Sequence, residues 1–150
     1  YAMPIVSLVD TPGFMVGPDS EKDGAVRRMS KLFTRGSKIV SPLIAIFIRK
    51  GYGLGAQAMV GGSLHDPVFT AAWPDGEFGA MGLEGAVKLG FKKELESEAN
   101  NEKREQMFNE LVNKLYKKGK AIEAAAHLEI DAVIDPADTR QTILKAVKIL

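Results

Sequence analysis

The segment "LIAIFIRKGYGLGAQAM", residues 43–59, decides the fold of this chain. Its first part, residues 43–50, is a nearly continuous apolar run, which is typical of a parallel strand covered on both faces. Three glycines at alternate positions follow, and a short helix over residues 55–62 is predicted after them. Glycines at such a turn let the backbone approach a ligand closely and leave N–H groups of the first helical turn free. The pattern fits a binding site, and it also fits a tight strand-to-helix turn with small-residue packing.

The segments around this one predict an α/β domain. A second apolar run, residues 4–10, predicts another strand covered on both faces, and residues 20–40 between the two strands have helical spacing of Val26, Met29, Phe33 and Val40. A strand, a helix and a strand over about 45 residues form a crossover unit of a parallel sheet. The other expected elements are strands at 68–73 and 77–82, helices at 83–90 and 100–119, and a short strand and helix within 131–150, where Asp135 is the N-cap.

Composition excludes several classes of protein. The 150 residues are 45% hydrophobic and 26% charged, which indicates a globular chain with a real core. The net charge of +1 argues against a nucleic-acid-binding surface, and the absence of cysteine excludes disulfides, zinc ribbons and thiol catalysis. No apolar run reaches the roughly 18 residues that cross a membrane. Because the chain starts almost inside a strand without methionine, we expect it to be part of a longer protein.

The stretch "LVDTPGF", residues 8–14, raises the alternative of a GTPase. Asp-x-x-Gly after a strand suits a loop that holds magnesium. A GTPase also needs a guanine-reading Asn-Lys-x-Asp at the end of the next strand, where this chain reads "IRKGYGLG" instead. Since a short motif without its context is only a hypothesis, the GTPase interpretation is disfavoured. A plain turn that ends the strand remains an alternative for this stretch.

Four segments follow one another along the chain: "DTPGFMVGPDSEKDGAV", "IRKGYGLGAQAM", "AAWPDGEFGAMGLEGAV" and "IDAVIDPADTR". Together they resemble the C-terminal domain of the carboxyltransferase (β) subunit of biotin-dependent acyl-CoA carboxylases such as propionyl-CoA carboxylase, and the resemblance covers residues 1–150. It implies a crotonase-type fold of ββα units around a superhelical axis. It also implies an N-terminal acyl-CoA-binding domain outside this chain and a dimer-based homo-oligomer, commonly a hexamer.

The resemblance implies that the chain is the biotin side of an enzyme that moves a carboxyl group from carboxybiotin to the α-carbon of an acyl-CoA. Propionyl-CoA or a related short acyl-CoA is the expected substrate. Biotin is carried on a partner, a biotin carboxyl carrier or biotin carboxylase subunit, and no metal is expected in this domain. The cytoplasm, or the mitochondrial matrix in a eukaryote, is the expected location. The alternatives are the corresponding subunit of a biotin-dependent acyl-CoA decarboxylase, which works with a membrane partner, and a non-catalytic interaction domain.

Matching the family motif onto this sequence assigns site residues. The backbone N–H groups of Gly55 and Ala56 are expected to bind the ureido oxygen of biotin, and each such donor is worth roughly 3 kcal/mol of barrier. Asp10 is expected to hold its loop through hydrogen bonds rather than act as a base, and Phe14 is expected to pack on the biotin ring. The predicted cofactor-binding residues are Pro12, Gly13, Phe14 and Gly53.

One departure from the family pattern concerns the substrate. Many propionyl- and acetyl-CoA carboxylases read Gly-Gly-Ala-Tyr-Asp, whose Asp helps to select the acyl chain, and we match Ala58 to that Asp. Ala58 is therefore predicted to affect substrate selectivity, and a less polar pocket would admit a larger or different acyl group.

The remaining polar candidates have simpler explanations. His65 and His127 lie far apart in sequence without a ligand cluster, so both are predicted to be structural or surface residues. Trp73 is predicted to pack in the core where a strand ends. Arg49 and Lys50 are predicted to form a solvated rim at the end of their strand. The lysines at 117, 118 and 120 are typical of a helix end that favours cations.

Overall fold

The computed structural model of the chain describes residues 3–149. It contains a five-stranded parallel sheet with β2 at its centre. β1 runs along one edge of β2. Along the other edge β3 pairs with the first half of β2, from Ile44 to Phe47, and β4 pairs with its last residues, from Lys50 to Tyr52. The strands are β1 (Ile5–Thr11), β2 (Leu43–Tyr52), β3 (Phe69–Ala72), β4 (Glu77–Gly79) and β5 (Ala132–Val133), which pairs with β3.

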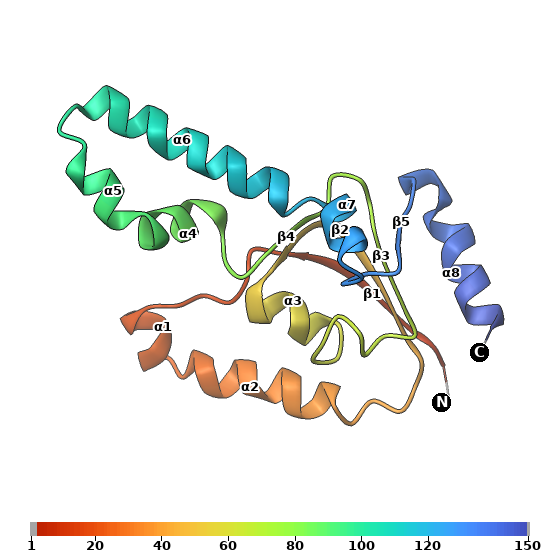
Figure 1. The fold of residues 1–150 in the computed structure, drawn as a ribbon. Coiled ribbons are helices and arrows are strands. Elements are labelled where there is room, and N and C mark those ends of the chain that lie inside the picture. Colours follow the sequence, from red (N-terminus) through yellow and green to blue (C-terminus); the bar gives the residue numbers. More distant parts are fainter. Residues whose placement is uncertain (1–2, 150) are drawn as a thin grey trace.

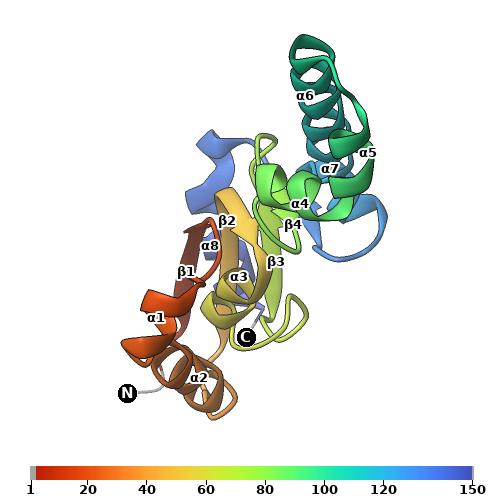
Figure 2. The same ribbon diagram turned by 90° about the vertical axis from the view of Figure 1, so that its left-hand side faces the viewer.

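Helices cover both faces of this sheet and also extend beyond it. In Figure 1, α3 lies on one side of the sheet and α8 on the other, while α4, α5 and α6 form an arm that points away from the strands. Figure 2 shows the same arm from the side. The helices are α1 (Pro18–Lys22), α2 (Ala25–Gly36), α3 (Gly53–Met59), α4 (Leu83–Gly90), α5 (Lys92–Ser97), α6 (Asn101–Lys118), α7 (Ala121–Ala126), the 3₁₀ turn η1 (Pro136–Asp138) and α8 (Thr139–Lys148).

Successive side chains of β2 point to opposite faces of the sheet, and this alternation divides the apolar core into two layers. Ala45 and Phe47 are fully buried on the face that packs against α3 and α7. Ile44 and Ile46 are fully buried on the opposite face, under α8. Because both layers are apolar, the central strand reads as one continuous apolar run. Trp73 joins the second layer, where its Nε1–H donates to Thr139 Oγ1 of α8 at 2.9 Å, so the prediction that it packs in the core is confirmed.

Most predicted elements are present, with small shifts at their ends. The 3₁₀ turn before α8 is capped by Asp135, whose carboxylate accepts the N–H of Ala137 at 2.8 Å, as predicted. The predicted crossover helix is divided into α1 and α2, because Gly24 takes a φ of +72° that interrupts the helix. Two short helices, α5 and α7, were not predicted. Among residues 3–149, no helix combines the length and the apolar character needed to span a bilayer.

The prediction that β1 is covered on both faces is wrong within the described residues. Its apolar run predicted burial on both faces, yet Ile5, Val6 and Leu8 are 39%, 41% and 53% exposed. The reason is that β1 is the last strand of the sheet, and the nearby α8 covers its outer face incompletely. The predicted apolar face of the crossover helix is also incomplete, since Val26 is 62% and Val40 99% exposed.

Candidate functional site

Three main-chain segments meet at the carboxyl ends of β1, β2 and β4. Gly53 has a φ of +59°, and a Cβ on it would lie 2.7 Å from the carbonyl oxygen of Ala80. A Cβ on Gly55 would lie 3.0 Å from the Cα of Gly13, whose own φ is +102°. A side chain at either position would force the segments apart, so glycine is what permits this contact. The predicted loops around Gly13 and Gly53 are therefore neighbours in space.

Helix α3 starts from this junction with a buried first turn. Tyr52 is its N-cap, and both Gly55 and Ala56 are buried. In a regular helix the N–H groups up to the third helical residue have no acceptor within the helix, so the N–H of Gly55 is available to a ligand. The N–H of Ala56 is the first with a possible acceptor, the carbonyl of Tyr52. Of the two predicted donors, Gly55 is therefore the one without an acceptor inside the helix. That the two N–H groups bind a ligand stays a prediction.

Two side-chain interactions fix these strand ends. Asp10 accepts hydrogen bonds from Nε and Nη2 of Arg49, at 3.2 and 2.9 Å, and from the N–H of Lys50 at 3.2 Å. The hydrogen bond from Arg49 is the main reason that the pKa of Asp10 lies below its usual value, so this carboxylate is a weak base. Tyr52, which is 3% exposed, donates its hydroxyl to Glu77 of β4, and burial raises the pKa of that hydroxyl. Asp10 makes hydrogen bonds, as predicted, but they join the end of β1 to β2 rather than holding its own loop.

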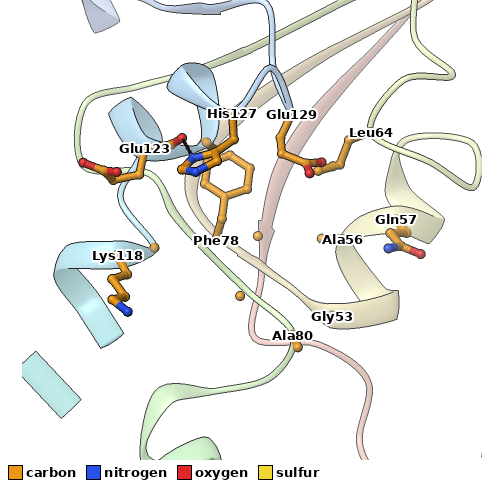
Figure 3. A pocket seen from close by; sticks show the side chains of 14 residues that line it. Gly53, Ala56, Gln57, Leu64, Phe78, Ala80, Lys118, Glu123, His127 and Glu129 are labelled. Atoms are coloured by element: carbon orange, nitrogen blue, oxygen red, sulfur yellow. Dashed lines mark hydrogen bonds between the residues drawn. The ribbon is translucent and has the colours of Figure 1, made fainter. Parts of the chain in front are cut away.

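A cavity of about 430 Å³ opens beside the first turn of α3 (Figure 3). One wall consists of small residues from the ends of β2 and β4 and from α3. The opposite wall consists of longer, mostly polar side chains from the end of α6, from α7 and from the turn after it. The lining residues are Gly51, Gly53, Ala56, Gln57, Leu64, Phe78, Gly79, Ala80, Lys118, Gly119, Glu123, Ala124, His127 and Glu129.

His127 belongs to the polar wall of this cavity. Its Nδ1 lies 2.8 Å from the carbonyl oxygen of Glu123, so Nδ1–H donates to that carbonyl and Nε2 is left as an acceptor. His65 is not among the lining residues, although its Nε2 lies 4.0 Å from Oε2 of Glu129. His127 was not predicted to line a site because the residues that face it across the cavity, such as Gln57, are about 70 positions away in the chain.

Gln57 and Ala58 of α3 lie in different environments. Gln57 lines the cavity, whereas Ala58 is 8% exposed on the buried side of the helix and is not among the lining residues. Successive residues of a helix point about 100° apart, which accounts for the difference. Gln57 was not singled out from the sequence. The predicted effect of Ala58 on selectivity stays a prediction.

Phe14 lies away from this cavity. Its ring packs edge-on against Phe33 of α2, with 6.4 Å between the ring centroids, and it lines a second cavity of about 410 Å³ together with Gly13. Pro12 is exposed. Gly13 therefore contacts both the α3 junction and the second cavity, and the predicted packing of Phe14 on a biotin ring stays a prediction.

The comparisons with known proteins agree on a family. The family model of the carboxyl transferase domain matches residues 1–150. The chain belongs to the carboxyl transferase family. It is 35% identical to the methylmalonyl-CoA carboxyltransferase 12S subunit of Propionibacterium freudenreichii subsp. shermanii, over 99% of this chain and 28% of that protein. It is 36% identical to a biotin-dependent acetyl-/propionyl-coenzyme A carboxylase beta5 subunit of Mycobacterium leprae, over 100% of this chain and 28% of that protein.

Solved structures of carboxyl transferases share the fold of this domain. A single-chain, multi-domain long-chain acyl-CoA carboxylase is 50% identical with a TM-score of 0.84, over 97% of this chain and 14% of that chain. The β subunit of geranyl-CoA carboxylase from P. aeruginosa is 29% identical with a TM-score of 0.83, over 99% and 28% of the two chains. The predicted crotonase-like α/β fold is confirmed. The domain spans little more than a quarter of the curated relatives, at 28% of their length.

Within residues 3–149 of this carboxyl transferase domain, no group of three or more His, Asp or Glu side chains is arranged to hold a metal ion.

The junction at Gly53 can be tested by adding one methyl group. Gly53→Ala is expected to lower the free energy of unfolding by about 2 kcal/mol or more, since a left-handed φ alone costs a residue with a Cβ roughly 1–2 kcal/mol. The matched control is Gly85→Ala in α4, where a Cβ meets open space. The control should stabilise the domain by about 0.5–1 kcal/mol. Urea unfolding measures the free energy of unfolding of both variants. The same change in both would contradict the close approach at Gly53.

The ion pair of Asp10 predicts a dependence of stability on pH. A carboxylate whose pKa is lowered by folding stabilises the native state at pH values above its unfolded pKa, near 4, and loses that effect as the pH falls through the folded pKa. Because Arg49 is 63% exposed, the effect is screened. Asp10→Asn should therefore lower the melting temperature at pH 7 by no more than about 4 °C. The difference from the wild type should shrink as the pH falls below about 4 and through the lowered folded pKa of Asp10. A difference that stays constant as the pH falls would rule out this origin.

Proposed function

We propose that this chain is the biotin side of a carboxyltransferase that moves a carboxyl group from carboxybiotin, held on a carrier partner, to the α-carbon of an acyl-CoA. One observation carries the proposal. In a chain of this family, the glycine turn at the end of β2 starts a helix whose residues Gly53 and Ala56 line a cavity of about 430 Å³, while Gly55 between them is buried and is not among the lining residues. Acyl-CoA binding, and the donors that would stabilise negative charge on the thioester oxygen of the acyl-CoA, are assigned to the part of the subunit that relatives carry beyond the matched 28%.

The cavity suits a small bicyclic ring with a polar ureido edge. Its volume lies within the range of ligand sites, which is about 300–1,000 Å³. Gly53 and Ala56 let a ring approach the main chain, and Phe78 offers an apolar surface. Gln57 and His127 line the cavity and offer polar groups that could accept hydrogen bonds from ureido N–H groups. These features support biotin as the ligand of this cavity.

The residues of this chain would act through their main chain. When bound, biotin supplies the nitrogen that carries the carboxyl group. Negative charge develops on the ureido oxygen as that group is transferred, and the N–H groups of Gly55 and Ala56 would stabilise it. Both residues are buried, so the donors are already oriented and act in a low dielectric. No side-chain base from this domain is needed for this role, which agrees with the lowered pKa of Asp10.

The acyl group has two candidates. Propionyl-CoA or a related short acyl-CoA is the first, because relatives at 33–36% identity are named propionyl- or acetyl-/propionyl-CoA carboxylases. A longer acyl group is the second, and it is favoured by the 50% identity to a long-chain acyl-CoA carboxylase. Ala58 in place of the family's Asp also favours it, since a less polar pocket would admit a larger acyl group.

The proposal is tested with the subunit that contains this chain, its biotinylated carrier and a panel of acyl-CoA substrates from acetyl to long-chain. Carboxylation of an acyl-CoA supports the function. Transfer only from a carboxylated acyl-CoA to the carrier would favour the decarboxylase alternative, and transfer in neither direction would favour a non-catalytic domain.

Removal of one main-chain donor should reduce turnover strongly. Ala56→Pro deletes the N–H of that residue and is expected to lower kcat by about a hundred- to a thousand-fold. Ala56→Gly is the control, because it keeps the N–H and removes only the methyl group. Steady-state kinetics measure the loss, and the melting temperature shows whether the proline variant is folded. A folded Ala56→Pro with wild-type kcat would contradict the oxyanion role of Ala56.

Selectivity should respond to a carboxylate on α3. Ala58→Asp is expected to shift kcat/KM toward propionyl- or acetyl-CoA by tens to hundreds of fold, since about 1–3 kcal/mol of discrimination is available per methylene. Gln57→Asp is compared with it, because that side chain lines the cavity. The acyl-CoA panel measures both variants. An unchanged substrate ranking for Ala58→Asp together with a changed ranking for Gln57→Asp would move the selectivity position to Gln57.

A further inference from the structure

Tyr52 stands between the central strand and the first turn of α3. It is the last residue of β2 and the N-cap of α3. The usual N-cap residues are Ser, Thr, Asp and Asn, whose side-chain oxygens accept the N–H of the second or third helical residue. Within the described residues, the side chain of Tyr52 makes no such bond to α3. The third helical residue is Gly55, so the N-cap leaves the N–H of Gly55 free for another acceptor.

The hydroxyl of Tyr52 is directed to β4 instead of the helix. It donates to the carboxylate of Glu77, the first residue of that strand. Tyr52 is 3% exposed, and the residues that bury it belong to this chain. Burial and the hydrogen bond to Glu77 raise the pKa of the hydroxyl, so it stays protonated and acts as a donor. A buried hydroxyl that lost this acceptor would be left unpaired, which is costly.

The ring of Tyr52 contacts the same strand two residues further along. Tyr52 pairs with Gly79 in the parallel register of β2 and β4. A Cβ on Gly79 would lie 3.1 Å from Cε1 of Tyr52, so the ring lies against this glycine. Tyr52 therefore contacts β4 at both of its ends, through the hydroxyl at Glu77 and through the ring at Gly79.

Strand β4 is held by few main-chain bonds. It has three residues, and it pairs with β2 along Lys50–Tyr52. On its other side the N–H of Phe78 donates to the carbonyl of Gly119 at 2.6 Å. A hydrogen bond to a charged carboxylate is stronger than one between neutral groups. The bond from Tyr52 to Glu77 is therefore a main constraint on where β4 lies along β2.

The position of β4 matters for the site because residues at its end belong to the cavity wall. Gly79 and Ala80 both line the cavity of about 430 Å³, and the carbonyl of Ala80 lies against Gly53 (Figure 3). Since this contact leaves no room for a Cβ, a shift of β4 would move the start of α3 with it. The bond between Tyr52 and Glu77 can thus act on the first turn of α3 from outside the cavity.

We propose that Tyr52 is a positioning residue for the transfer step: its hydrogen bond to Glu77 holds β4, and through β4 the first turn of α3 with its two N–H donors. This inference rests on the proposed function. Neither Tyr52 nor Glu77 is among the described residues that line the cavity, so the pair acts on the position of the donors and not by contact with the ligand. Such donors stabilise developing charge only when they are placed accurately, so a small displacement lowers the rate of transfer.

The test uses the subunit that contains this chain, with its biotinylated carrier and an acyl-CoA that it carboxylates. Tyr52→Phe removes the hydroxyl and keeps the ring against Gly79. It is expected to lower kcat by about tenfold, which is less than the hundred-fold or more that follows the loss of a whole donor. KM for the carrier and for the acyl-CoA should not change, because the lost stabilisation belongs to the transition state.

Three further variants separate positioning from a general loss of stability. Glu77→Gln keeps an oxygen that accepts the Tyr52 hydroxyl, so it should retain most of the wild-type kcat. Glu77→Leu removes the acceptor and should lower kcat about as much as Tyr52→Phe, and it replaces that variant if Tyr52→Phe does not fold. Thr139→Val is the matched control, since it removes the hydroxyl that accepts Nε1–H of Trp73 on the opposite face of the sheet. It should lower the melting temperature and leave kcat unchanged.

Each outcome decides the inference. A lowered kcat with unchanged KM in Tyr52→Phe, together with an active Glu77→Gln, supports it. A folded Tyr52→Phe with wild-type kcat overturns it, and so does a raised KM with unchanged kcat, because Tyr52 would then affect binding alone. An equal loss of kcat in Thr139→Val or in Glu77→Gln also overturns it, since stability or the charge of Glu77 would then be the cause. If the wild type transfers no carboxyl group, the proposed function itself fails and the inference falls with it.

Discussion

Three main-chain segments approach one another closely at the carboxyl ends of β1, β2 and β4, and the rest of the structure depends on that approach. Gly53 turns the chain from β2 into α3 against the carbonyl of Ala80, and Gly55 brings the first turn of α3 against Gly13. Because neither contact leaves room for a Cβ, the position of α3 on the sheet is fixed by the absence of side chains. The cavity, its small-residue wall and the buried N–H groups all follow from this constraint.

Because of this constraint, the main chain and the side chains have different roles in the site. Donors from the start of α3 are held by the fold itself, while the pairs Asp10–Arg49 and Tyr52–Glu77 hold the strand ends that carry them. Polar side chains come from the opposite wall, where α7 and the turn after it face α3. In the proposed function the main chain stabilises charge and the opposite wall contacts the ligand, so no side-chain base from this domain is needed.

Local sequence patterns predicted the fold because they depend on the burial of neighbouring residues and on turn geometry. The apolar run of β2 and the cap at Asp135 are features of neighbouring residues, and both are confirmed. The exposed face of β1 was not predictable, because an apolar run does not say whether a covering element lies within the same chain. His127 and Gln57 were missed for a related reason: their proximity is a property of the tertiary fold, and the motif that contains Gln57 does not show which of its side chains faces a cavity.

In the proposed function, the first turn of α3 and the cavity beside it bind the ureido group of biotin. The decisive measurement is a crystal structure of the subunit that contains this chain, with biotin bound. We expect the ring in the cavity between α3 and α7, with its ureido oxygen about 2.7–3.1 Å from the main-chain nitrogens of Gly55 and Ala56. Biotin in the second cavity beside Phe14 and Phe33, or a ureido oxygen bound by a side chain, would contradict it.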